Sequence, residues 1–567
     1  MKTILVFLAL LATGAAGQQP PTEPATLVLR NGKIITVDAA RPEAQAIAIR
    51  GDRITAVGSN ADIQRHTGPS TQVIDLDGRT AIPGLVESHG HFMGLGQSKM
   101  TLDLMDVRDW NEVVSMVGAA AAKAKPGDWI LGRGWHQEKW SNVPQPNVEG
   151  FPMHDALSKV SPNNPVMLTH ASGHATFVNA RAMELAGITA ETQNPSGGEI
   201  LKDKSGRPIG LLRETASRLA GRPYDDWMAK KTPADREADA RRQIELAVQA
   251  SLEAGVTSFH DAGSSFQTID LFKRVAAEDK LGIRLWVMVR DTIDNLREKL
   301  PQYKAVGLNN HHLTIAAIKV TSDGALGSRG AWLLQPYTDS PSSVGLPTTP
   351  IENVGQIAKL AIDNGVQLCV HAIGDRANRE VLNVYEAAFK AHPGQKDLRW
   401  RIEHAQHLNA ADIPRFGKLG VVAAMQANHA TSDAPYVPAR LGAARAEEGA
   451  YVWQKLMKTG AVIANGTDVP VERIDPMVNF HASITRKTKD GSVFYGDQKM
   501  TRAEALKSYT WNGAFAAREE ALKGSLAPGK LADVTVLSKD IMTVPEDEIL
   551  ATQVVYTIVG GKIAYRR

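Results

Sequence analysis

Short apolar runs alternate with longer amphipathic stretches through the middle of the chain. Such an alternation is typical of an α/β fold in which crossover helices join parallel strands. The runs predicted to be strands are residues 80–89, 256–259, 283–289, 314–320, 366–370, 400–403, 421–425 and 461–465. A closed (β/α)8 barrel has eight parallel strands and needs about 250 residues. The chain has 567 residues, so we expect this barrel together with smaller parts.

Both chain ends carry a different pattern, in which short strands alternate with tight turns. Asn31-Gly32 and Gly51-Asp52 are predicted to be hairpin turns. Each end alone offers few strands and little core, although a separate domain at each end is the alternative. We therefore expect residues 26–80 and 520–567 to form one composite β-sandwich domain. The barrel would occupy residues 81–519.

The first predicted crossover is far too long for a single helix. It contains strand-like runs of its own and a turn-rich segment, Gly197-Gly198-Glu199. We expect residues 95–250 to form an inserted subdomain that rises from the first βα loop. Barrel enzymes keep their active sites on that face, so the subdomain is expected to border the site.

The N-terminus predicts export. Lys2, the apolar residues 4–12 and the small residues that follow are typical of a signal peptide, which we place at residues 1–17. An uncleaved N-terminal anchor is the alternative. No later segment approaches the ~20 apolar residues of a membrane-spanning helix. We expect a periplasmic or secreted protein without stable membrane insertion.

Composition excludes several classes of protein. The formal net charge is only +3, whereas nucleic-acid binding usually requires a clustered basic face, so we expect no nucleic-acid partner. Cys369 is the one cysteine, which excludes an intrachain disulfide and a cysteine-based zinc site.

Potential metal ligands occur where the predicted strands end. His89 and His91 are two residues apart at the end of the first strand, so their imidazoles can face the same side. His371, His404 and Asp468 follow later strands. All strands of a parallel barrel end at one mouth, where these side chains can converge. Imidazole and carboxylate ligands suit borderline divalent ions such as zinc.

Lys319 lies in the fourth predicted strand, on the face shared with Ile315 and Ala317 that we expect to point into the barrel. A buried ammonium beside metal cations is costly and tends to deprotonate. The neutral amine could then add CO2 and form a carbamate that bridges two metal ions. The alternative, which the spacing alone favours, is a buried lysine paired with Asp323 or with a substrate carboxylate.

These residues together resemble the metal-dependent amidohydrolase superfamily. In detail they resemble amidohydrolase family 3, the YtcJ-like branch that includes N-substituted formamide deformylases. The matching motifs are residues 83–91, 173–179, 319–329, 371–377, 403–406, 466–468 and 529–533. The resemblance covers nearly all of the chain from Thr26 onward. It implies a small-molecule amide substrate and allows a homodimer, since superfamily members often dimerise.

The resemblance further implies two divalent metal ions at the barrel mouth, for which we expect zinc. The two histidines of the first strand would hold one ion and the two later histidines the other. A CO2-derived carbamate on Lys319 and a hydroxide would bridge them. Asp468 would bind the first ion, accept the proton of the attacking hydroxide and return it to the leaving nitrogen. The implied metal ligands are His89, His91, Lys319, His371, His404 and Asp468.

Other residues are candidates for substrate contacts. His174 could donate a hydrogen bond to the tetrahedral oxyanion, or it could be structural. Arg329 could bind a substrate carboxylate, or it could belong to a structural ion pair. Trp135 could form part of an aromatic wall of the pocket, or it could pack within the inserted subdomain. The remaining candidates are His170, His260 and His429.

The sequence therefore predicts an amidohydrolase, a metal-dependent hydrolase that cleaves an amide-type, non-peptide C–N bond. A mononuclear hydrolytic deaminase or cyclic-amide hydrolase on the same barrel is the alternative. A non-catalytic binding protein is a more remote alternative. Loss of a metal ligand would mark such a protein, and the sequence retains every implied ligand.

Overall fold

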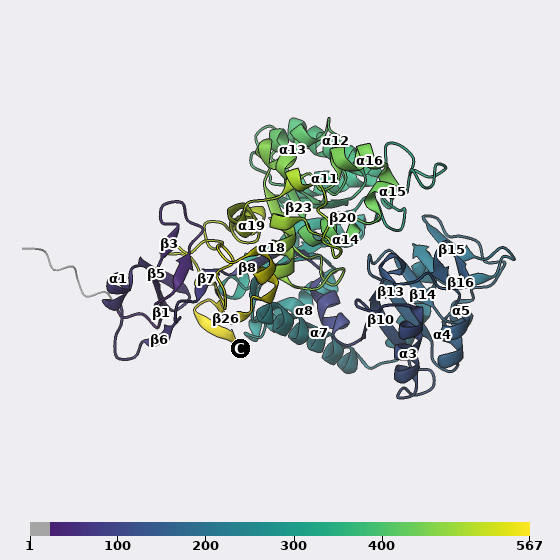
Figure 1. Ribbon diagram of the computed structural model, residues 1–567, viewed down its shortest axis with the longest axis horizontal. Helices are drawn as coiled ribbons and strands as arrows, with labels where there is room; N and C mark the ends of the chain where they lie inside the picture. The colour runs from purple at the N-terminus through teal and green to yellow at the C-terminus, as the bar shows by residue number, and fades with distance from the viewer. Residues whose placement is uncertain (1–22) are drawn as a thin grey trace, which may run out of the picture.

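The computed structural model describes residues 23–567, which form three adjoining parts (Figure 1). A barrel lies in the middle, a small β-domain lies on one side of it, and an inserted sheet lies on the other. The predicted signal peptide, residues 1–17, is outside the described residues. Within residues 23–567, no helix is both long enough and apolar enough to cross a membrane.

The barrel consists of eight parallel strands in chain order, which confirms the predicted (β/α)8 fold. Apolar runs form these strands because they are buried on both faces. The strands are β8 (Leu85–Gly90), β17 (Val256–Ser264), β18 (Arg284–Val289), β20 (Leu313–Thr321), β21 (Gln367–Ala372), β22 (Arg401–His404), β23 (Val422–Met425) and β24 (Ile463–Asn465). Backbone hydrogen bonds join the first strand to the segment after the last one, from Asp468 N to His89 O at 2.8 Å and from His91 N to Val469 O at 2.7 Å.

The first predicted strand, residues 80–89, differs from the structure because the chain changes sheets at Gly84. Strand β7 (Thr80–Pro83) lies in the small β-domain, whereas β8 lies in the barrel. A Cβ atom at Gly84 would lie 2.2 Å from Oγ1 of Thr257, so only glycine permits this close approach. Each of the other seven predicted strands overlaps an observed one.

Helices cover the outside of the barrel, each with one apolar face turned inward. In α11 (Ile351–Asn364) the buried positions Val354, Ile357, Ala358, Ala361 and Ile362 follow the helical repeat. Other helices begin at capping side chains: Thr232 caps α7 (Pro233–Glu253) and Ser265 caps α8 (Phe266–Ala277). The same layer contains α9 (Ile293–Tyr303), α12 (Asp375–Ala391), α13 (Ile413–Leu419), α17 (Trp453–Lys458) and α20 (Trp511–Ala516).

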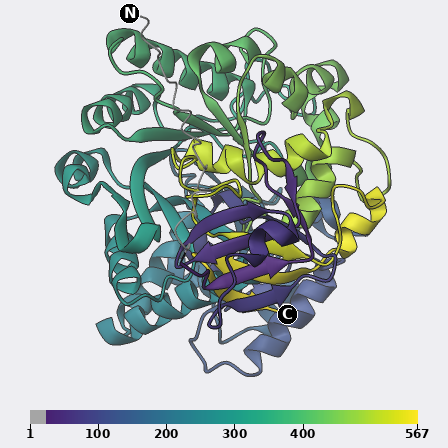
Figure 2. The ribbon, with the colours of Figure 1, turned by 90° about the vertical axis from the view of Figure 1, so that its left-hand side faces the viewer.

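The small β-domain combines strands from both ends of the chain, which lie side by side in Figure 2. One sheet has the order β5 (Arg53–Gly58), β4 (Ala46–Arg50), β1 (Leu27–Arg30) and β6 (Gln72–Asp75). The other has the order β27 (Lys562–Arg566), β26 (Val554–Val559), β25 (Val534–Leu537), β7, β2 (Lys33–Ile35) and β3 (Glu43–Ala44). Side chains from both sheets, including Leu29, Ile47 and Val536, share one core.

The inserted subdomain has a mixed sheet of its own. Its strand order is β15 (Gly198–Lys202), β16 (Pro208–Glu214), β14 (Ala175–Val178), β13 (Val166–His170), β10 (Ile130–Trp135) and β9 (Leu102–Asp103). Its helices are α3 (Trp110–Ala121), α4 (Asp155–Val160), α5 (Ala180–Ala186) and α6 (Ser217–Ala229). Most of helix α7 falls in the predicted insertion, residues 95–250, but the helix packs against α2 (Phe92–Ser98) and β17 and therefore belongs to the barrel.

His407 is buried in this fold in a neutral state. Its side chain packs against the ring of Tyr451, and neither ring nitrogen has a hydrogen-bond partner. Burial lowers the pKa of His407 to about 3. In the unfolded chain the pKa is about 6.5, so below that pH the unfolded state binds a proton that the native state does not. The contribution to stability is complete above pH 6.5 and is lost as the pH falls toward 3.

We expect His407→Phe to weaken the pH dependence of stability. Between pH 7 and pH 5 the native protein should lose about 2 kcal/mol of unfolding free energy through His407, and the variant should keep this amount. Chemical denaturation at both pH values measures the difference. His392→Phe, at a partly exposed position, is the matched control and should behave as the native protein. Equal pH dependence in the native protein and His407→Phe would contradict this explanation.

Candidate metal centre

The C-terminal ends of the barrel strands open into a cavity of about 710 Å³. Residues at the strand ends form its base, and loops of the inserted subdomain form part of its wall. The residues predicted from the sequence that line it are His89, His91, His174, Lys319, His371, His404, His429 and Asp468.

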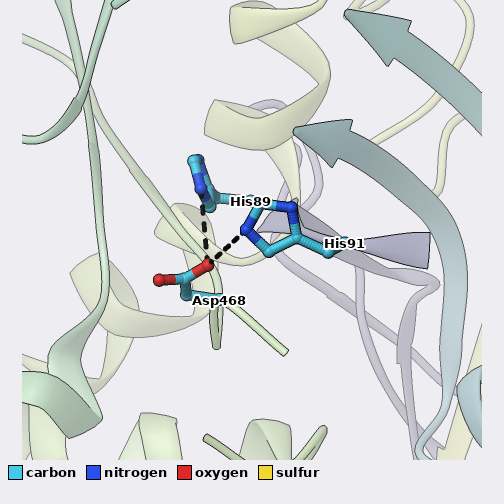
Figure 3. A group of neighbouring side chains, drawn as sticks. All are labelled: His89, His91 and Asp468. Carbon is cyan, nitrogen blue, oxygen red and sulfur yellow. Dashed lines mark ion pairs between the residues drawn. The ribbon is translucent and has the colours of Figure 1, made fainter. Parts of the chain in front are cut away.

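His89, His91 and Asp468 form one group of potential metal ligands. Figure 3 shows both imidazoles beside one carboxylate oxygen: Oδ1 of Asp468 is 3.5 Å from Nε2 of His89 and 3.2 Å from Nε2 of His91. All three ligand atoms lie within 4.8 Å of one another. Gly466 permits this approach of the last strand to the first, because a Cβ atom there would lie 2.4 Å from Oε1 of Glu87.

His404, His429 and Asp468 form a second group within the same distance limit. The His404 ring centroid is 4.7 Å from that of His89 and 4.5 Å from that of His371. The two groups share Asp468, so the candidate ligands form one connected cluster across the cavity base. His429, which the sequence suggested as a substrate contact, belongs to the second group and comes from α14 (Ala427–Asp433).

Unpaired buried atoms test whether these residues fit a metal ion. Nε2 of His89, Nε2 of His371 and Oδ1 of Asp468 are buried without a hydrogen-bond partner. Such atoms are costly unless something binds them. Imidazole nitrogens and a carboxylate oxygen are the ligands that zinc and similar divalent ions prefer. The residues therefore fit a divalent metal.

Two of the candidate ligands have a strained backbone. His404 has φ +76° and Asp468 has φ +57°, in the left-handed region that residues other than glycine seldom adopt. Strain of this kind persists where the surrounding structure enforces it, and it concentrates at functional sites.

A buried carboxylate orients His89. Oε2 of Glu403 is hydrogen-bonded to Nδ1 of His89, and Arg401 donates to both oxygens of Glu403 at 2.8 and 2.9 Å. Burial would raise the pKa of Glu403, but the charges of Arg401 and His89 outweigh it and hold the pKa far below its usual range. A carboxylate on Nδ1 leaves Nε2 of His89 free to bind a metal ion. Arg401 also contacts Nδ1 of His260 at 3.1 Å, so His260 lies beneath the centre and does not line the cavity.

Lys319 lies buried in β20 at the cavity base. In residues 23–567 its amine has no hydrogen bond and no carboxylate within 4.0 Å. Asp323, the partner that the spacing favoured, instead accepts backbone N–H groups of Ile373 and Gly374 at 3.0 and 2.8 Å. Burial lowers the pKa of Lys319 to about 8, so the neutral amine is accessible.

His174 reaches the cavity from the loop before β14. Its Nδ1 lies 2.9 Å from Oε2 of Glu214, at the end of β16. Burial alone would lower the pKa of His174, but the Glu214 carboxylate outweighs it and raises the pKa. The imidazole can therefore present an N–H donor at Nε2. Glu214 was missed from the sequence, because no motif surrounds it.

Two aromatic candidates of the inserted subdomain lie outside the cavity lining. Trp135 is fully buried in the subdomain core, where its Nε1 donates to Leu168 O at 3.0 Å, in agreement with the packing alternative. The ring nitrogens of His170 lie 2.8 Å from Oγ of Ser172 and 3.1 Å from Oε1 of Gln137. Neither side chain is placed to contact a substrate in this cavity.

Arg329 is likewise absent from the cavity lining. Its Nη2 forms an ion pair with Asp339 at 3.0 Å, so Arg329 belongs to a structural ion pair, which was the alternative to a substrate contact. The arginines that do line the cavity are Arg133, Arg218 and Arg290, and the sequence motifs single out none of them.

A (β/α)8 barrel whose mouth gathers histidines, a carboxylate and a lysine defines a metal-dependent hydrolase. The chain belongs to the amidohydrolase family, whose profile matches residues 72–565. The resemblance stated from the motifs is thereby confirmed, and the chain is an enzyme that hydrolyses carbon–nitrogen bonds of small molecules.

Similar proteins span nearly the whole chain. Protein LONG AFTER FAR-RED 3 of Arabidopsis thaliana is 33% identical over 552 residues, which are 95% of this chain and 92% of that protein. N-substituted formamide deformylase of Arthrobacter pascens is 27% identical over 96% of this chain and 99% of that protein. The crystal structure of an uncharacterised metal-dependent hydrolase from Pyrococcus horikoshii OT3 matches with a TM-score of 0.73 and 25% identity, covering 92% of this chain and 99% of that one.

Proposed function

We propose that this enzyme hydrolyses a non-peptide amide of a small molecule by means of two divalent metal ions, with zinc as the resident metal. The observation that carries the proposal is the convergence of imidazoles, a carboxylate and an unpaired lysine on one cavity. The residues that would hold the ions are His89, His91, Lys319 as its carbamate, His371, His404 and Asp468. When bound, such ions lower the pKa of water and polarise an amide carbonyl.

The protein's own groups would move the protons. Asp468 lies between the two ligand groups, where a carboxylate oxygen can accept the proton of the attacking water. The same carboxyl then returns the proton to the leaving nitrogen, which departs as a neutral amine. The N–H of His174 would donate to the carbonyl oxygen as negative charge develops there.

Metal removal tests the proposal. We expect chelation to abolish hydrolysis and zinc to restore it, in a screen of N-substituted formamides, N-acyl amino acids, lactams and aryl amides. The formamides are included because the Arthrobacter pascens relative is named for deformylation of that class. Full activity in a metal-free sample would overturn the proposal.

Metal stoichiometry separates this mechanism from the mononuclear alternative. Two ions per chain, and an intact mass greater by one CO2, are expected from elemental analysis and mass spectrometry. One ion per chain with an unmodified Lys319 would instead favour a mononuclear deaminase or cyclic-amide hydrolase.

His174→Asn is expected to lower kcat by about 10²–10³-fold, the usual effect of removing one oxyanion donor. Asparagine is too short to place an N–H group where Nε2 of the imidazole lies, so the donor to the oxyanion is lost, whereas substrate affinity should change little. Steady-state kinetics on a substrate from the screen measures both parameters. His170→Asn is the matched control, because His170 belongs to the same subdomain and does not line the cavity. Equal effects of the two substitutions would contradict the role of His174.

We also propose that the protein is exported, on the basis of the N-terminal pattern. Cell fractionation should find the protein outside the cytoplasm, with a mature N-terminus after Gly17. A cytoplasmic protein that retains residues 1–17 would contradict export.

A further inference from the structure

Each of the four acidic residues of the cavity lining has at least one contact, although Oδ1 of Asp468 and Oε1 of Glu214 have no hydrogen-bond partner. The Asp468 carboxylate lies against imidazoles, and that of Asp433 accepts the hydroxyl of Tyr451 at 2.5 Å. The other two acidic residues of the lining form ion pairs, Glu214 with His174 at 2.9 Å and Glu472 with Lys139 at 3.5 Å. In residues 23–567, none of these four carboxylates forms an ion pair with Arg218 or Arg290, two of the arginines that line the cavity.

Arg218 and Arg290 face the same cavity without a carboxylate partner. Arg290 directly follows β18 at the barrel mouth, and its Nη2 donates to Oγ1 of Thr321 at 2.6 Å. Arg218 lies in the first turn of α6. In the part of the chain that the structure describes, neither guanidinium has a carboxylate oxygen within 4.0 Å.

The positive charge of Arg218 acts on the guanidinium group of Arg290. The surrounding protein, and after it the positive charge of Arg218, lower the pKa of Arg290. Two like charges that face one concave wall are unfavourable by themselves and attract an anion. Both side chains keep exposed surface, so a ligand in the cavity can reach them. Each guanidinium group can bind a carboxylate through two parallel N–H donors.

The position of Arg290 places these two arginines beside the candidate metal centre. A Cβ atom at Gly263 would lie 3.0 Å from Cδ of Arg290 and 3.3 Å from Cγ of Lys319. Only one small residue therefore separates the stems of the two side chains. A carboxylate bound at Arg290 would therefore lie close to the candidate metal centre, which suits a substrate whose carboxylate and amide nitrogen are attached to the same carbon atom.

We propose that Arg218 and Arg290 bind the carboxylate of the substrate, which makes N-acyl amino acids the substrate class of this enzyme. The proposal rests on the amide hydrolysis proposed above. It assigns the specificity-determining role to these two arginines, whereas the sequence suggested Arg329, which is paired with Asp339.

The test compares acids with their neutral isosteres. N-acetyl amino acids with small, aliphatic, aromatic and acidic side chains, and the corresponding carboxamides, are assayed with the zinc-loaded enzyme. We expect kcat/KM to be higher for the acid in each hydrolysed pair. In Arg290→Gln and Arg218→Gln that acid-to-amide ratio should fall about 10–100-fold, mainly through KM, because charge-assisted hydrogen bonds are lost. Arg222→Gln, on the same helix and outside the cavity lining, should leave the ratio unchanged.

A binding measurement separates this proposal from the proposed function. Calorimetric titration of the Asp468→Asn variant with each acid and amide should show tighter binding of the acid, and Arg290→Gln should abolish the difference. Hydrolysis of neutral amides with no preference for acids, in kinetics and in binding, would overturn the anion subsite and leave amide hydrolysis intact. Absence of hydrolysis across the panel would overturn the proposed function. Tighter binding of acids that depends on Arg290 would still support the subsite in that case.

Discussion

Asp468→Asn is expected to lower kcat by about 10³–10⁴-fold, the upper range of general acid–base catalysis, while the protein remains folded. Asparagine has nearly the same shape as aspartate and can keep a contact with His91 at 3.2 Å. It carries no negative charge for a metal ion, and it cannot accept a proton from water and return it to a leaving nitrogen. Steady-state kinetics, with elemental analysis and circular dichroism, measures activity, metal content and fold.

Asp433→Asn is the control for this substitution. Asp433 also lines the cavity, but its carboxylate is engaged by the hydroxyl of Tyr451 at 2.5 Å and belongs to neither ligand group. Its replacement should change kcat by less than about tenfold, since a hydrogen-bond acceptor is kept and no proton transfer is lost. Asp468→Asn with full metal content and more than one tenth of the native kcat would remove Asp468 from the mechanism.

The candidate ligands could be predicted from the sequence because the barrel topology positions them. His89 and Asp468 are far apart in the chain, yet a backbone hydrogen bond of 2.8 Å joins them in the fold. The C-terminal ends of the parallel strands meet at the mouth, so strand pattern and residue type indicate the candidate ligands, although His260 shows that not every such side chain reaches the cavity. His371 and His404 follow the same rule.

The cavity wall was less predictable, because loops and the inserted sheet obey no such rule. Arg329 follows a glycine-rich turn, and the sequence does not show that Asp339 is its partner. Glu214 ends a strand of a sheet whose direction relative to the barrel has no sequence signal. Arg290 directly follows a barrel strand, so the strand-end rule applied to cations would have found it.

The roles of the residues beneath the site could not be predicted from the sequence, for a different reason. Glu403 was part of a recognised motif, but its hydrogen bond to His89 depends on the pairing of side chains across the barrel interior. Arg401 lies two residues earlier on the same strand and donates to the same carboxylate. Alternation along a strand predicts that the two share a face, whereas it does not identify the histidine that completes the contact.

Lys319→Met is expected to lower kcat by about 10³-fold or more and to reduce the metal content. The reason is that bound metal ions stabilise the charge of the transition state by several kcal/mol, and this effect requires an intact metal centre. Methionine fills a similar volume in the buried position of Lys319, but it has no amine that could become a carbamate. Kinetics and elemental analysis measure both effects. The native mass should exceed that of the unmodified chain by one CO2, and the variant should show no such increase.

Lys319→Ala provides the matched comparison, because it removes the carbamate and also leaves space at the cavity base. Added formate or acetate can occupy that space and supply an anion at the same place, so partial recovery of activity and metal content is expected. The same carboxylates should not rescue Lys319→Met, in which the side chain still fills the space. If Lys319→Met retains two metal ions and native activity, or if both variants respond equally to acetate, the amine of Lys319 has no role in holding the metal centre.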